Sequence, residues 1–112
     1  MKKKIAIIGL GYVGLPLLYE FSKHHKVTGF DINKKLIESL NKNIDDKNIY
    51  SRKELKSCKA NFASNPINLK NNEIFIITVP TPVNKNKKPD LSPLIESTKL
   101  ISKYMRKNNL II

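Results

Sequence analysis

The feature that most constrains this chain is a group of three glycines between an apolar run and an amphipathic segment. Residues 5–8 are all apolar, and a short continuous apolar run is typical of a strand buried on both faces of a parallel sheet. Gly9, Gly11 and Gly14 follow at once, and after them apolar residues recur at helical spacing as far as Phe21. The sequence therefore predicts a strand, a tight turn and a helix in direct succession.

The same alternation continues along the chain. We expect strands at residues 4–10, 26–32, 60–64, 73–79 and 110–112, and helices at residues 12–24, 33–43, 52–57 and 93–107. Apolar strands that alternate with helices indicate a parallel sheet covered on both faces. Right-handed crossovers then give an α/β fold, a Rossmann-like doubly wound parallel sheet. The 112 residues suffice for one small domain, and we expect its sheet to be incomplete at the C-terminal end.

The sequence also predicts two helix caps, a last buried strand and the inward face of the last helix. Asn33 is expected to cap the second helix, and Ser92 to cap the last long helix, with Pro93 at its first position. The apolar run at 110–112 is expected to form another buried strand. The residues of the last helix that we expect to face inward are Leu94, Ile95, Thr98, Ile101 and Met105.

The three glycines fit a dinucleotide-binding turn. Gly9 permits the tight turn, Gly11 lets the backbone approach a pyrophosphate, and Gly14 allows close packing of the helix. The helix N-terminus would offer free N–H groups to the phosphates. Asp31 ends the second predicted strand, 20 residues beyond Gly11. Its carboxylate could accept hydrogen bonds from both hydroxyls of the adenosine ribose and would repel a 2′-phosphate, which favours NAD over NADP. On position alone, Asp31 could equally be a turn or capping residue.

The composition limits the compartment and the partners. Lys and Arg total 21 against nine acidic residues, for a net charge of +12, but the lysines are spread over the whole length. We read them as a solvated surface and expect no nucleic-acid partner. A single cysteine excludes an internal disulfide framework and suits a cytoplasmic protein. No apolar run approaches the roughly 20 residues of a membrane span, so no membrane association is expected.

The remaining reactive side chains have plainer interpretations. Cys58 lies in a Lys-rich segment and is read as an unreactive cysteine, not a catalytic thiol. His24 and His25 have no metal-ligand partners nearby in the sequence, so no metal site is expected. The lysines at 85–88 are read as an exposed loop.

Three segments resemble one family, the UDP-glucose/GDP-mannose dehydrogenases. The first is residues 4–18, whose most specific part is Gly-Tyr-Val-Gly-Leu-Pro at 11–16, and the second is Val-Thr-Gly-Phe-Asp-Ile-Asn at 27–33. The third is Ile-Ile-Thr-Val-Pro-Thr-Pro-Val at 76–83, followed by Lys-Pro-Asp-Leu-Ser-Pro-Leu at 88–94. The two parts of the third segment look most like the branch that makes N-acetylated hexosaminuronic acids for capsule and O-antigen. The resemblance runs over essentially all 112 residues and covers only the first part of the family's N-terminal domain.

The resemblance implies an NAD-dependent, cytoplasmic enzyme that oxidises C6 of a UDP-sugar to a carboxylate, with a homodimer as the full-length protein. The family's catalytic residues lie in stretches beyond Ile112, so this chain would hold no catalytic residue and would bind NAD without turnover. The residues that would contact NAD are Gly9, Leu10, Gly11, Tyr12, Val13 and Gly14 at the pyrophosphate, Asp31 and Lys35 at the adenosine, and Thr78, Val79, Pro80 and Thr81 at the nicotinamide half. Family members often carry Arg where this chain has Leu36.

Two other functions remain open on the residues alone. Hydroxyacid, hydroxyacyl-CoA and 6-phosphogluconate dehydrogenases share the glycines and the acid, although residues 79–82 and 89–93 argue against them. The chain could also be a nucleotide-binding module without catalysis.

Overall fold

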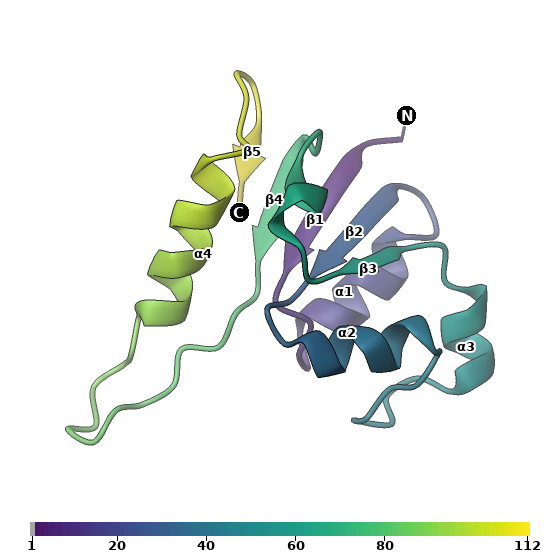
Figure 1. The fold of residues 1–112 in the computed structure, drawn as a ribbon, viewed down its shortest axis with the longest axis horizontal. Helices are drawn as coiled ribbons and strands as arrows, with labels where there is room; N and C mark the ends of the chain where they lie inside the picture. The colour runs from purple at the N-terminus through teal and green to yellow at the C-terminus, as the bar shows by residue number, and fades with distance from the viewer. Residues whose placement is uncertain (1) are drawn as a thin grey trace.

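The computed structural model describes residues 2–112, which form a parallel sheet flanked by helices (Figure 1). The strands lie in the order β3-β2-β1-β4-β5. They are β1 (Lys4–Ile8), β2 (Lys26–Phe30), β3 (Asn61–Ala63), β4 (Ile74–Ile77) and β5 (Leu110–Ile111). All four pairings are parallel, and Ile8 at the end of β1 is in register with Phe30 of β2 and Ile77 of β4. The chain therefore proceeds outward from β1 in one direction and then crosses over to β4 on the other side.

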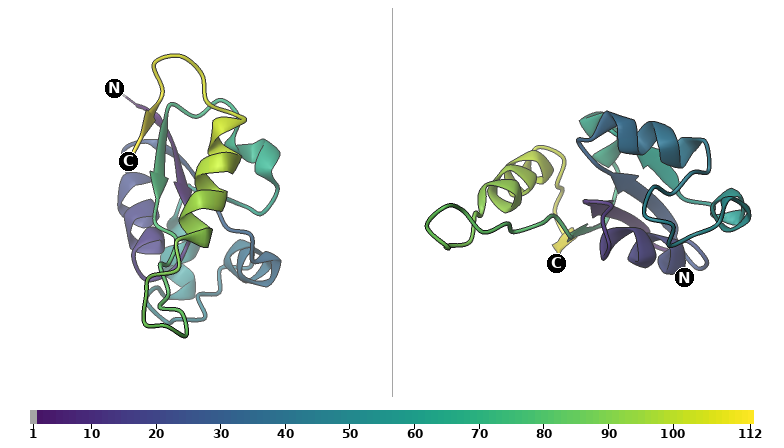
Figure 2. Two further views of the ribbon diagram at one scale, coloured as in Figure 1. Left: turned by 90° about the vertical axis from the view of Figure 1, so that its left-hand side faces the viewer. Right: turned by 90° about the horizontal axis from the view of Figure 1, so that it is seen from below.

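Helices cover both faces of this sheet, which confirms the predicted α/β, Rossmann-like, doubly wound fold. The helices are α1 (Gly14–Phe21), α2 (Lys34–Asn41), α3 (Arg52–Ser57), the short 3-10 helix η1 (Pro66–Leu69) and α4 (Ser92–Ser102). Residues of α1, α2 and α3 pack on one face, and those of η1 and α4 pack on the other. Figure 2 shows the sheet from its edge, between α1 and α4. The 3-10 helix was not predicted.

The apolar run of β1 explains why two layers of helices are needed. Its side chains alternate between faces, so Ile7 packs into the cluster that contains Leu18 of α1, whereas Ile8 packs with Phe75 and Ile101. All of these side chains are buried. A strand that is apolar on both faces can only be stable in the middle of such a sheet.

The helix caps confirm one prediction and correct another. Asn33 caps α2, because its Oδ1 accepts the N–H of Leu36 at 3.2 Å. The prediction that Ser92 caps α4 is wrong: Ser92 is the first residue of the helix, and Leu91 occupies the cap position without a side-chain hydrogen bond. Ser92 is engaged elsewhere, since its hydroxyl donates to Oδ1 of Asp90 at 2.6 Å.

The predicted burial of α4 is also largely wrong. Leu94 and Ile95 are 37% and 50% exposed, and Thr98 is exposed too. Ile101 is buried and Met105 packs partly against the same cluster, as expected. The helix ends at Ser102 and not at residue 107. The buried residues of α4 are Ser97 and Ile101, so only a narrow stripe of the helix meets the sheet.

The prediction that residues 110–112 form a buried strand is half right. Leu110 and Ile111 pair with β4, but their side chains are exposed, as is that of Ile112. Within residues 2–112, no helix combines the length and the apolar character needed to cross a membrane.

Candidate functional site

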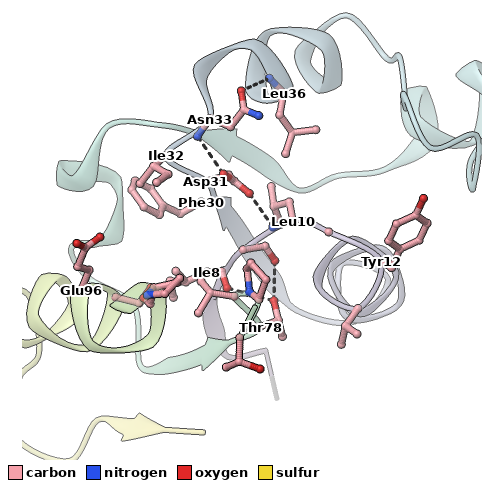
Figure 3. Close-up of a pocket in the computed structure, with 18 of the residues that line it drawn as sticks. Ile8, Leu10, Tyr12, Phe30, Asp31, Ile32, Asn33, Leu36, Thr78 and Glu96 are labelled. Carbon is pink, nitrogen blue, oxygen red and sulfur yellow. Dashed lines mark hydrogen bonds between the residues drawn. The ribbon is translucent and has the colours of Figure 1, made fainter. Parts of the chain in front are cut away.

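A cavity of about 750 Å³ opens at the carboxyl ends of β1, β2 and β4. This is where the strand order reverses, the place at which open α/β sheets bind ligands. Its volume lies within the range of small-molecule and cofactor sites. Figure 3 shows that its wall is formed by the end of β1, the turn after β2, the end of β4 and the first turns of α4.

The turn after β1 depends on Gly9. Gly9 has a φ of +96°, and a Cβ there would lie 2.9 Å from the backbone nitrogen of Val79. Its N–H donates to the carbonyl oxygen of Phe30 at 2.8 Å, which joins the turn to the end of β2. A residue with a side chain would be strained in this conformation and would also push the end of β4 away.

Gly14 and Gly11 differ sharply in their surroundings. A Cβ on Gly14 would collide with the carbonyl oxygen of Gly9 and with Oγ1 of Thr78, so α1 can begin this close to the turn only with glycine. A Cβ on Gly11 would meet nothing within 4 Å. The space in front of Gly11 is therefore open to a ligand.

Free backbone donors face this open space. Within residues 2–112, the N–H groups of Gly11, Tyr12 and Val13 have no hydrogen-bond acceptor. Tyr12 and Val13 are 74% and 62% exposed, although both lie just before α1. Unsatisfied N–H groups at the start of a helix attract anions, so the turn fits a pyrophosphate.

Thr78 fixes the turn from the side of β4. Its hydroxyl donates to the carbonyl oxygen of Gly9 at 2.6 Å and lies 3.1 Å from that of Ile8. Its N–H donates to the same Ile8 carbonyl at 2.8 Å. Thr78 thus holds the glycine turn at a set distance from β4.

Asp31 lies beside the glycine turn, just after the end of β2 (Figure 3). Its Oδ2 accepts the N–H of Leu10 at 3.0 Å, and its Oδ1 accepts the N–H of Asn33 at 2.9 Å. The carboxylate is thus the turn residue that its position alone suggested. Each oxygen keeps a further lone pair, so the fixed carboxylate can still accept hydrogen bonds from a ligand such as a ribose.

The structure brings most of the predicted site residues together around this cavity. Those that line it are Gly9, Leu10, Gly11, Tyr12, Val13, Asp31, Thr78, Val79, Pro80 and Thr81. Gly14 lies behind the turn, and Lys35 is exposed on α2 and does not line the cavity. The neighbouring Leu36 faces the cavity instead.

The sequence did not predict the wall that α4 forms, the apolar ends of two strands or the cation Lys47. The unpredicted residues that line the cavity, besides Leu36, are Ile8, Phe30, Ile32, Asn33, Lys47, Asp90, Ser92, Pro93, Glu96, Ser97 and Leu100. A helix that follows a parallel strand begins at the carboxyl edge of the sheet. The topology alone could therefore have indicated that residues at the start of α4 line the cavity. No sequence signal marks Lys47, which lies in a polar segment without periodicity.

The other reactive side chains lie away from the cavity. Cys58 is half-buried, with its Sγ 3.4 Å from Oγ of Ser22. His25 accepts the N–H of Lys3 at 3.0 Å through Nδ1. In the part of the chain that the structure describes, no three His, Cys, Asp or Glu side chains gather as metal ligands would.

The fold, the open amides and the fixed carboxylate define a dinucleotide-binding Rossmann domain. Residues 3–112 match the model of the UDP-glucose/GDP-mannose dehydrogenase family, NAD binding domain. The chain belongs to this family, and its cofactor is NAD. This membership decides against the other Rossmann dehydrogenases considered above.

Individual relatives agree with the family. The chain is 43% identical over 110 residues to UDP-N-acetyl-D-glucosamine 6-dehydrogenase of Pseudomonas aeruginosa, a match that covers 97% of this chain and 26% of the relative. It is 40% identical over 112 residues to Protein CapL of Staphylococcus aureus, covering 100% and 26%. The solved UDP-D-ManNAc dehydrogenase of Pyrococcus horikoshii superposes with a TM-score of 0.88 at 30% identity, covering 96% of this chain and 27% of that one. The chain thus spans about a quarter of the length of these relatives.

Proposed function

We propose that this chain is the NAD-binding portion of an enzyme that oxidises C6 of a UDP-N-acetylhexosamine, or of a UDP-hexose, to a uronic acid for capsular or surface polysaccharide. The observation that carries the proposal is the pairing of open amides with a fixed carboxylate beside them on the wall of one cavity. The substrate class rests on relatives named as UDP-N-acetylglucosamine and UDP-N-acetylmannosamine dehydrogenases.

The residues of this chain bind and orient the cofactor. NAD, when bound, supplies the hydride acceptor. The N–H groups of Gly11, Tyr12 and Val13 donate to the pyrophosphate, and Asp31 accepts from the hydroxyls of the adenosine ribose. Residues 78–81 border the nicotinamide half at the end of β4. Catalytic groups and the contacts to the UDP-sugar would come from the rest of a longer cytoplasmic protein, which we propose to be a homodimer.

Binding calorimetry on the complete natural protein that contains this chain tests the cofactor site. We expect NAD to bind more tightly than NADP, because the Asp31 carboxylate repels a 2′-phosphate. Asp31→Asn keeps an oxygen that can accept a hydrogen bond but removes the charge, so it should weaken NAD about tenfold and narrow the preference over NADP. Glu38→Gln is the matched control, because Glu38 is exposed on α2 and does not line the cavity.

Two outcomes would refute parts of the proposal. Equal affinities for NAD and NADP in the unmodified protein would refute the proposal that Asp31 binds the adenosine ribose and repels a 2′-phosphate. If the complete protein binds NAD but forms no NADH with UDP-N-acetylglucosamine, UDP-N-acetylmannosamine or UDP-glucose, the substrate class is wrong while the cofactor site stands.

A further inference from the structure

Lys47 is a cation that lines the cavity and has no role in the cofactor contacts proposed above. It lies between α2 and α3, and its Nζ is 5.8 Å from the centroid of the Tyr12 ring. Among the described residues that line the cavity, Lys47 is the only Lys or Arg, whereas three carboxylates line it: Asp31, Asp90 and Glu96. The charge of these side chains alone is thus unfavourable to an anionic ligand.

The backbone that carries Lys47 is held firmly. The carboxylate of Asp45, which is 5% exposed, accepts the N–H groups of Lys47 at 3.0 Å, Ile49 at 2.8 Å and Tyr50 at 3.0 Å. The Tyr50 ring stacks on Tyr19 of α1, with centroids 4.3 Å apart. The segment is therefore fixed against the same helix whose start carries the open amides.

The side chain, in contrast, is free to move from its resting position. Tyr12 is 74% exposed, and a cation over such a ring gains little. Lys47 can leave it for a stronger partner by rotating its flexible four-carbon stem. No other lysine offers itself here, because Lys35 does not line the cavity and the position beside it is the apolar Leu36.

We propose that Lys47 binds the diphosphate of the dinucleotide and offsets the carboxylates around it. This inference rests on the function proposed above and adds one affinity-determining residue to it. The amides of the glycine turn supply directional hydrogen bonds, and Lys47 supplies the full positive charge that the site otherwise lacks.

The test compares ligands with and without the diphosphate in the complete natural protein. Lys47→Gln should raise the Kd for NAD and for ADP about tenfold at low salt, and less at high salt, while the Kd for adenosine stays unchanged. Lys47→Arg should retain most of the affinity. Lys42→Gln is the matched control, because Lys42 is exposed at the end of α2 and does not line the cavity.

Two results would overturn the inference. One is a Lys47→Gln variant that binds NAD and ADP as tightly as Lys42→Gln. The other is a loss of adenosine affinity in the same proportion as ADP affinity, which would place Lys47 at the adenosine. In either case the unmodified protein's preference for NAD over NADP reports separately on the proposed function. Thermal unfolding of each variant checks that its fold is retained.

Discussion

The two sides of the cavity differ in how fully they are packed. On the glycine side, Leu15 and Leu18 of α1 and Leu40 of α2 are completely buried against β1 and β2. On the other side, the buried residues of α4 are Ser97 and Ile101, while Leu94 and Ile95 remain exposed. We call these the glycine side (residues 4–41) and the α4 side (residues 81–112).

The difference separates the part of the site that buried side chains and hydrogen bonds hold in place from the part that fewer buried side chains hold. On the glycine side, burial and hydrogen bonds fix the turn and Asp31 before any ligand arrives. On the α4 side, the exposed apolar residues contribute little to stability, because their surface stays in water. The half of the site that we propose to bind the adenosine and the pyrophosphate is therefore the preorganised half.

The largest effect should come from filling the space behind the glycine turn. Gly14→Ala forces a Cβ against the Gly9 carbonyl and Thr78 Oγ1, and should lower the free energy of unfolding by about 4 kcal/mol. Gly11→Ala is the matched control, and should change stability by less than about 1 kcal/mol because its Cβ meets nothing. Urea unfolding of both variants measures the two values. Equal losses would contradict the distinction between the two glycines.

Truncating a leucine on each side tests the difference in packing directly. Leu18→Ala empties a fully buried position and should cost about 3 kcal/mol. Leu94→Ala removes a partly exposed side chain and should cost less than about 1 kcal/mol. Urea unfolding of the two variants measures both free energies of unfolding. A loss at Leu94 as large as that at Leu18 would show that α4 is packed more firmly than the structure indicates.

The same difference explains what could be predicted from the sequence. The glycine side was predictable, because a buried strand, Gly9 and Asp31 each have a local requirement that the sequence displays. The face of α4 was not, because the spacing of Leu94 and Ile95 indicates a helix but not what lies opposite them. Lys47 was not predictable either, since the contacts of Asp45 that place it come from tertiary structure.

The starts of α2 and α4 also differ between the two sides, with smaller expected changes in the free energy of unfolding. Asn33→Ala removes the oxygen that accepts the Leu36 N–H and should destabilise the chain by about 1 kcal/mol. Ser92→Ala removes no cap from α4 and should cost less than about 0.5 kcal/mol. Urea unfolding of the two variants measures both losses. A larger loss for Ser92→Ala than for Asn33→Ala would show that Ser92 does cap α4.

The smallest effect concerns the pKa values of two carboxylates, Asp90 on the α4 side and Glu54 on α3, which belongs to neither side. Hydrogen bonds from the Ser92 hydroxyl, and then from its backbone N–H, lower the pKa of Asp90. At the start of α3, Ser51 and Glu54 form a capping box, in which the Ser51 N–H donates to Oε1 of Glu54 at 3.0 Å and the Glu54 N–H donates to Oγ of Ser51 at 3.1 Å. Hydrogen bonds from Ser51 lower the pKa of Glu54, and the backbone N–H of Ser51 has a larger effect than its side chain. A carboxyl whose pKa is lowered by folding stabilises the folded state above its unfolded pKa, and this contribution is lost as the pH falls through the lowered value.

Removing each serine side chain therefore affects its carboxylate differently. Ser92→Ala deletes the larger of the two causes at Asp90, so the pKa of Asp90 should rise most of the way to its ordinary value. Ser51→Ala leaves the backbone N–H, so the pKa of Glu54 should rise only slightly. Carboxyl NMR titration of the two variants measures both shifts. A larger rise at Glu54 than at Asp90 would mean that the Ser92 hydroxyl does not hold Asp90, and that the turn before α4 is looser than its 2.6 Å hydrogen bond implies.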